Sequence, residues 1–139
     1  DGDGISGRPN RVWSAEHDRL MAWVLGLSHA LNLMFAATLS NASDGEEAGV
    51  ERLASISSTT FQRQLDLATA VTGENPNLYF EIQHLNPNQE AVLGALAGTL
   101  DAVRAAIEGG DEQAFVALME RARDWARRHR DAAGAGSDR

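Results

Sequence analysis

Between residues 14 and 40, apolar side chains recur every three or four positions, which is the spacing of one helix face. These positions are Leu20, Trp23, Val24, Leu27, Leu31, Met34 and Phe35. Met21, Leu25 and Leu33 lie off that face, so the helix is apolar around most of its circumference. Such a helix needs neighbours on several sides. We expect it to be buried and to take part in a subunit interface.

Capping residues predict where the next helices begin and end. Residues 50–56 are expected to form a short helix after a loop at 41–49. Ser57 and Ser58 then precede a third helix that ends at Gly73. Serine hydroxyls accept hydrogen bonds from the first backbone N–H groups of a helix, and glycine is favoured just past its end.

Three further helices follow. Asn75 and Pro76 are typical of a helix start, and Pro87 stops that helix. A long apolar period then continues until the Gly109–Gly110 pair, and Asp111 caps the last helix. Since no segment alternates with period two, the chain is predicted to be an all-α domain of five or six helices with a long, buried first helix.

The ends of the chain differ in composition from its middle. Residues 1–12 are rich in glycine and develop no apolar period, so we expect a flexible linker there. Residues 13–130 are predicted to form the helical domain. Residues 131–139 combine alanine, glycine and charged residues, and we expect a disordered tail.

The composition narrows the classes of partner. The chain has 139 residues, no cysteine and a formal charge of −8, and its 12 basic residues are all arginine. Disulfides and thiolate metal sites are therefore excluded. An acidic surface without lysine disfavours nucleic acid and anionic membranes as partners. The excess of acidic residues and the absence of lysine have two explanations. One is adaptation to high salt or a GC-rich genome, and the other is ordinary compositional drift.

The most apolar stretch, Leu20 to Leu39, approaches the length of a membrane span. Arg19, His29 and Asn32 interrupt or flank it, and no second such stretch follows, so we expect no membrane segment. The polar start of the chain has no signal-peptide pattern, and we expect a cytoplasmic protein.

Two histidines, His17 and His29, lie on the first predicted helix. Twelve residues correspond to about 18 Å of helix rise, so they cannot bind one metal ion together, and we predict no metal site. His17 is either a capping or surface residue or part of a polar site. His29 lies among leucines, where its imidazole needs a partner, either within the core or in a ligand. Arg63 either binds a carboxylate in a bidentate pair or is a solvated side chain beside Asp66.

Three separate stretches resemble one family. EHDRLMAWVLGLSHALN is similar to the start of the C-terminal helical domain of prephenate dehydrogenases, in which an HDR is followed by a second histidine twelve residues after the first. LASISSTTFQRQLDLA resembles the next helix of that family, and NPNLYFEIQHLNP its NP-x-LY-x-x-I segment. The resemblance covers residues 14–125.

The resemblance implies a homodimeric all-α domain like the C-terminal domain of 6-phosphogluconate dehydrogenase, following an NAD(P)-binding Rossmann domain absent from this chain. The parent enzyme would convert prephenate to 4-hydroxyphenylpyruvate by oxidative decarboxylation, in tyrosine biosynthesis, with NAD or NADP bound mainly by the absent domain. The catalytic histidine would lie in that domain, so this fragment alone is not expected to be active. The position matching His29 would contact substrate, and His17 with Asp18 would belong to a polar network near the cleft.

One position departs from the family pattern. The family places a substrate-binding arginine directly after the aromatic residue of an SSPxYR-like stretch, whereas SSTTFQR has Gln62 there and Arg63 one later. A shift of one position along a helix rotates the direction of the side chain by about 100°. Loss of a charge-assisted pair would weaken carboxylate binding by roughly 1.5 to 3 kcal/mol. Gln62 and Arg63 are thus candidate substrate residues, and compensation by another arginine, an arogenate-specific enzyme, and loss of activity all remain open.

Two alternatives belong to other classes. The chain could be a non-catalytic helical dimerisation or regulatory module that binds no substrate. A helical chorismate mutase is disfavoured, because such a site needs several converging cationic groups and this chain has no lysine and few core-facing arginines.

Overall fold

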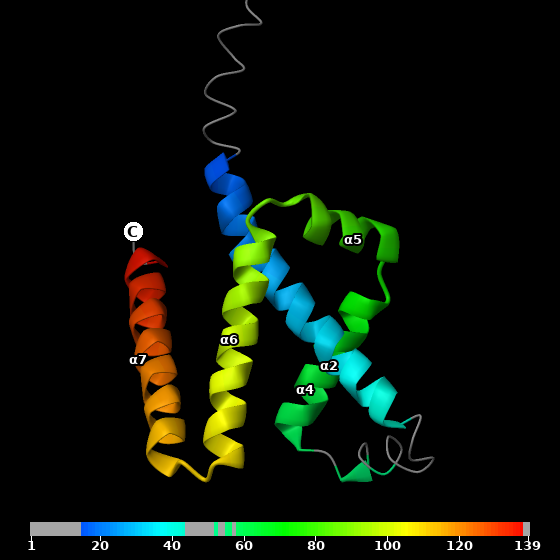
Figure 1. The fold of residues 1–139 in the computed structure, drawn as a ribbon. Helices are drawn as coiled ribbons and strands as arrows, with labels where there is room; N and C mark the ends of the chain where they lie inside the picture. Colours follow the sequence, from blue (N-terminus) through cyan, green and yellow to red (C-terminus); the bar gives the residue numbers. More distant parts are fainter. Residues whose placement is uncertain (1–14, 44–51, 53–54, 57, 138–139) are drawn as a thin grey trace, which may run out of the picture. The chain divides into compact units, whose positions relative to one another are not determined.

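The computed structural model describes residues 15–43, 52, 55–56 and 58–137, and every element in these ranges is helical (Figure 1). This confirms the all-α prediction. The elements are η1 (Ala22–Gly26), α2 (Leu27–Ser43), α4 (Thr59–Thr72), α5 (Pro76–Leu85), α6 (Gln89–Glu108) and α7 (Glu112–Ser137). The expected linker at 1–12 and most of the short helix expected at 50–56 lie outside the described residues.

The first helix extends three residues beyond the end that the sequence predicts. Residues 15–21 are α-helical, η1 is a five-residue π-helical segment, and α2 continues to Ser43. The π segment is marked by the Leu27 N–H, which donates to the carbonyl of Ala22 five residues earlier. The small residues Ala22, Gly26 and Ala30 are buried on one side of this first helix. The rest of the helix stays open, with Val24 58% and Leu31 44% exposed.

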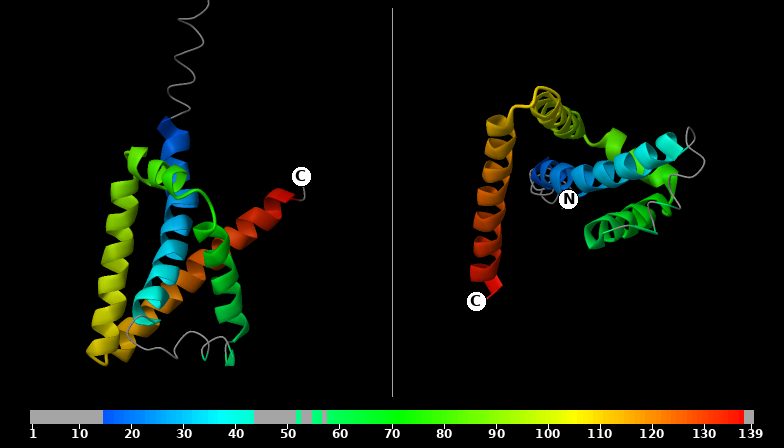
Figure 2. Two further views of the ribbon diagram at one scale, coloured as in Figure 1. Left: turned by 90° about the vertical axis from the view of Figure 1, so that its right-hand side faces the viewer. Right: turned by 90° about the horizontal axis from the view of Figure 1, so that it is seen from below.

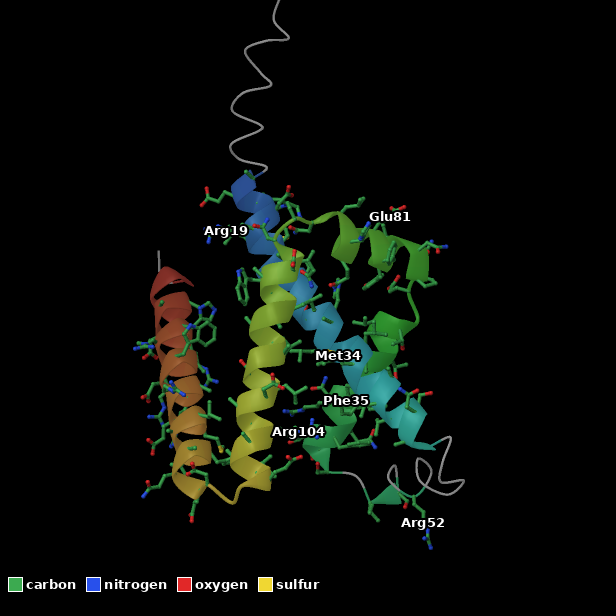
Figure 3. The ribbon with its side chains drawn as sticks, viewed as in Figure 1. Arg19, Met34, Phe35, Arg52, Glu81 and Arg104 are labelled. Atoms are coloured by element: carbon green, nitrogen blue, oxygen red, sulfur yellow. The ribbon has the colours of Figure 1, made fainter. Side chains whose placement is uncertain are left out.

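Helix α4 packs along α2 (Figures 1 and 2). It begins where expected, because the Ser58 hydroxyl accepts from the Phe61 N–H at 3.2 Å, and Gly73 caps its end. The rings of Phe61 and Phe35 lie 5.8 Å apart, centroid to centroid, where α2 and α4 meet (Figure 3). Ala68 is fully buried.

Helix α5 is held between two asparagine caps. The side chain of Asn75 accepts hydrogen bonds from the backbone N–H groups of Asn77 and Leu78, and Pro76 occupies the first turn, as predicted. At the other end, Asn86 donates through Nδ2 to the backbone carbonyl of Asp18 at 2.7 Å. This bond ties the end of α5 to the first helix.

The chain divides into two compact units, residues 1–94 and 95–139, and the division falls within α6. In the second unit, Gly110 adopts a positive φ of 64° at the predicted break, and Asp111 caps α7 through a 3.0 Å bond from the Ala114 N–H. Helix α7 extends to Ser137, into the stretch for which the sequence predicts a disordered tail. Residues 131–137 include three alanines, and alanine is the strongest helix former, which favours the added turns.

One stretch of the described residues, Ala15–Ala42, is long and apolar enough to cross a membrane by length and composition. A helix that loses its apolar surface to a partner subunit has the same properties. Only a small part of this stretch is buried within a single chain, which leaves the predicted need for neighbours on several sides unmet by the described residues.

Candidate functional site

A pocket of about 360 Å³ lies in the first unit, beside His29. Its walls come from α2, from the end of α4 and the turn that follows it, and from α5. The lining residues are His29, Leu33, Val71, Thr72, Glu74, Pro76, Tyr79, Phe80 and Gln83. We call it the His29 pocket. Its volume and its mixture of apolar walls with a few polar groups are those of a small-molecule site.

His29 is half-buried and lies against Tyr79. The two ring centroids are 4.6 Å apart and the ring planes are inclined by 41°. The Nδ1 atom of His29 is buried and has no hydrogen-bond partner among the described residues. Buried polar atoms are nearly always satisfied, so a buried imidazole nitrogen beside a pocket calls for a partner that the described residues do not supply.

A glutamine pair fixes the wall next to His29. Gln83 donates through Nε2 to the carbonyl of Gly26 at 3.1 Å, and its Oε1 accepts from Nε2 of Gln89. Gly26 allows this close approach, because a Cβ atom at that position would collide with the Gln89 side chain. The π segment, α5 and the start of α6 are therefore joined at one buried point.

The sequence analysis assigns these residues no role in a site. Tyr79 belongs to the NP-x-LY-x-x-I segment but is interpreted from the sequence as a core aromatic residue, and no role is expected for Gly26, Gln83 or Gln89. The one available signal is Gly26 itself, a glycine inside a long apolar helix, which often marks a close approach of another chain segment. Glu74 is likewise unremarkable in sequence, as the residue between a helix-ending glycine and a capping asparagine.

Gln62 and Arg63 lie apart from His29. Gln62 is half-buried and Arg63 is exposed on α4, and neither lines the His29 pocket. The side of α4 that meets α2 carries Phe61 and Gln64, whose Nε2 donates to Oδ1 of Asn32 at 2.9 Å. The structure therefore does not bring the two predicted substrate residues of α4 together with His29 within one chain.

His17 and Asp18 are exposed in the helical turns before η1. Asp18 contributes its backbone carbonyl, through the bond from Asn86, to a polar contact between the first helix and the end of α5. Their membership of a polar network near a cleft stays a prediction. No group of three or more His, Asp or Glu side chains in the described ranges is arranged to hold a metal ion.

A second, wider hollow of about 810 Å³ lies between α2 and α4. It is open and mainly apolar, with Leu31, Met34 and Phe35 from α2 facing Phe61 and Leu67 from α4. Asn32 and Gln64 form its polar centre. Among the residues that the structure describes, no arginine lines this hollow or the His29 pocket.

The comparisons with family models and with curated proteins point to the same family. Residues 13–121 match the family model described as the prephenate dehydrogenase dimerization domain. The match includes the first helix, both pockets and the first part of α7. No solved structure matches.

Three curated relatives are distant. The chain is 25% identical over 118 residues to the T-protein of Enterobacter agglomerans, covering 85% of this chain and 31% of that protein. It is 24% identical over 107 residues to a probable arogenate/prephenate dehydrogenase of Methanocaldococcus jannaschii, covering 77% and 23%. It is 32% identical over 116 residues to the 4-amino-4-deoxyprephenate dehydrogenase of Streptomyces pristinaespiralis, covering 84% and 38%. The chain thus spans well under half the length of each relative.

Proposed function

The chain belongs to the prephenate dehydrogenase dimerization-domain family, and from that premise we propose that it is the dimerisation and substrate-pocket part of a prephenate dehydrogenase-like enzyme. The observation that carries the proposal is the position of His29. In a chain of this family, its imidazole lies at a pocket of ligand size, and its buried Nδ1 lacks a partner among the described residues.

The reaction would be the oxidative decarboxylation of a cyclohexadienyl substrate, in which the ring loses carbon dioxide and becomes aromatic while NAD(P), when bound, takes a hydride. The described residues are helical throughout and contain no strand followed by a glycine-rich turn, so they offer no dinucleotide cradle. The dinucleotide would be held by a domain outside this chain. The part played by this chain is to bind and orient the substrate.

His29 and Tyr79 supply one wall of that substrate site. The glutamine pair, through Gly26, fixes the helix turn before His29, so the imidazole is presented in one orientation. A site held in place before the substrate arrives loses less conformational entropy on binding. The apolar wall residues, such as Leu33, Val71 and Phe80, would cover the ring of the substrate and exclude water.

The dimer would form through the first helix. Leu20, Trp23, Val24, Leu31 and Met34 are large, apolar and more than two-fifths exposed in the single chain. A patch of this kind marks a protein interface, and a second copy of this helix would remove it from water. This proposal also answers why the helix is apolar around most of its circumference.

The test is an assay of the full-length parent protein for NAD(P)H formation that depends on prephenate or an amino analogue. We expect turnover with at least one such substrate, and none when the 139-residue chain is assayed alone. A parent that forms dimers but oxidises none of these compounds would instead support the non-catalytic module, an alternative that gains support from Gln62 and the lack of an arginine in the pocket.

A further inference from the structure

The charged groups around the His29 pocket are unusual for a site that binds a dicarboxylate. Among its nine lining residues, Glu74 is the only carboxylate, and there is no arginine. The chain as a whole carries 20 acidic residues against 12 basic ones. A dianionic substrate with a carboxylate at this pocket would therefore meet like charge rather than a guanidinium.

Glu74 is held in place by its neighbours in the chain. It lies between the glycine that caps α4 and the asparagine that caps α5, and its own N–H donates to the carbonyl of Val71 at 3.2 Å. Its side chain is exposed, whereas His29 is half-buried. The Glu74 side chain is therefore more accessible to solvent than the imidazole of His29.

The remaining polar groups of the wall are largely engaged. The side-chain amide of Gln83 donates to the carbonyl of Gly26 and accepts from the side-chain amide of Gln89. The hydroxyl of Thr72 donates to the carbonyl of Ala68 at 2.8 Å. Glu74, the imidazole of His29 and the hydroxyl of Tyr79 are thus the groups best able to select a substrate, and Glu74 is the one that carries a negative charge.

We propose that the His29 pocket receives a primary ammonium group, so that the substrate is an amine-bearing cyclohexadienyl carboxylate rather than prephenate. This inference rests on the proposed function. Glu74 would accept hydrogen bonds from the ammonium, while the apolar walls cover the ring. The ammonium could belong to an amino acid side chain, as in arogenate, or to the ring, as in 4-amino-4-deoxyprephenate.

The experiment compares kcat/KM of the full-length parent for prephenate, arogenate and 4-amino-4-deoxyprephenate, with NAD and with NADP. We expect one of the two amines to exceed prephenate by about tenfold or more, the size of one charge-assisted hydrogen bond. The preferred amine identifies where the ammonium lies on the substrate. Preference for prephenate would overturn this inference and leave the proposed function intact, whereas oxidation of none of the three would overturn both.

The variant Glu74→Gln isolates the role of the carboxylate. We expect it to lower kcat/KM for the preferred amine by roughly fivefold to tenfold and thereby to reduce the preference for that amine over prephenate. The matched control is Glu81→Gln, which removes the same charge from an exposed position of α5 outside the pocket (Figure 3). An equal loss with all three substrates, or the same loss in the control, would contradict recognition of an ammonium by Glu74.

Discussion

The imidazole of His29 lies against the ring of Tyr79, with 4.6 Å between centroids, although the two residues are fifty positions apart in the chain. This contact joins α2 to α5 at the wall of the pocket. It places the imidazole at the pocket wall, with its buried Nδ1 lacking a partner among the described residues.

Replacement of His29 by alanine in the full-length parent should weaken substrate binding far more than dinucleotide binding. The imidazole lines the pocket of this chain, whereas the dinucleotide is expected on another domain. We expect KM for the substrate to rise by about tenfold or more, from loss of a buried hydrogen bond, with little change for NAD(P). Steady-state kinetics with each ligand varied would measure both. Equal effects on the two would argue against a substrate-side role.

Gly26→Ala should destabilise the fold, because the added methyl group would collide with the Gln89 side chain in a buried place. Overpacking of this kind costs about 1 to 3 kcal/mol. Thermal unfolding followed by circular dichroism would show the lower Tm.

Gly98→Ala is the matched control for that change. A Cβ atom at Gly98 meets nothing within 4 Å, and the residue is exposed on α6. The same substitution there should stabilise the helix by about 0.5 to 1 kcal/mol. If both alanine variants shifted Tm in the same direction, the close approach of Gln89 to Gly26 would not be the cause.

The isolated 139-residue chain should be a dimer at micromolar concentration, and Val24→Asp should convert it to a monomer. Val24 is 58% exposed in the single chain, so a charge there costs little in the monomer but would be desolvated in the interface. Light scattering after size exclusion measures the molar mass. Asn77→Asp, an exposed position in α5, adds the same charge and should leave the dimer intact.

Gln64→Ala should destabilise the packing of α4 on α2. The amide of Gln64 donates to Asn32, which is buried and also donates through Nδ2 to the carbonyl of Ser28 at 2.9 Å. Leaving the Asn32 oxygen without its donor costs about 1 to 3 kcal/mol. Denaturant unfolding would detect the change, and Gln113→Ala on the exposed side of α7 should have almost no effect.

Local signals predicted the helices well, because a cap involves residues only two or three apart. Ser58, Asn75 and Asp111 each accept the hydrogen bonds expected of them. Helix α7 runs to Ser137, into the stretch for which the composition of 131–139 suggested disorder, and the three alanines of that stretch favour helix.

The pocket could not be predicted in the same way. Its wall depends on a bond between Gln83 and Gly26, which are 57 positions apart, and on a ring contact between His29 and Tyr79. Neither pair has a characteristic spacing, because tertiary packing rather than sequence separation brings them together. The family resemblance directed attention to His29, but it gave no indication of Glu74.

The π segment absorbs one extra residue within the first helix. Because five residues in π geometry turn the chain through about the same angle as four in α geometry, the helix before the segment and the helix after it keep nearly the phase of an uninterrupted α-helix. Deletion of one residue between Ala22 and Gly26 would therefore restore regular α-helix and leave the Asp18 carbonyl facing Asn86. What such a deletion would remove is the wide turn itself, whose buried residues Ala22 and Gly26 include the glycine that lies against Gln89.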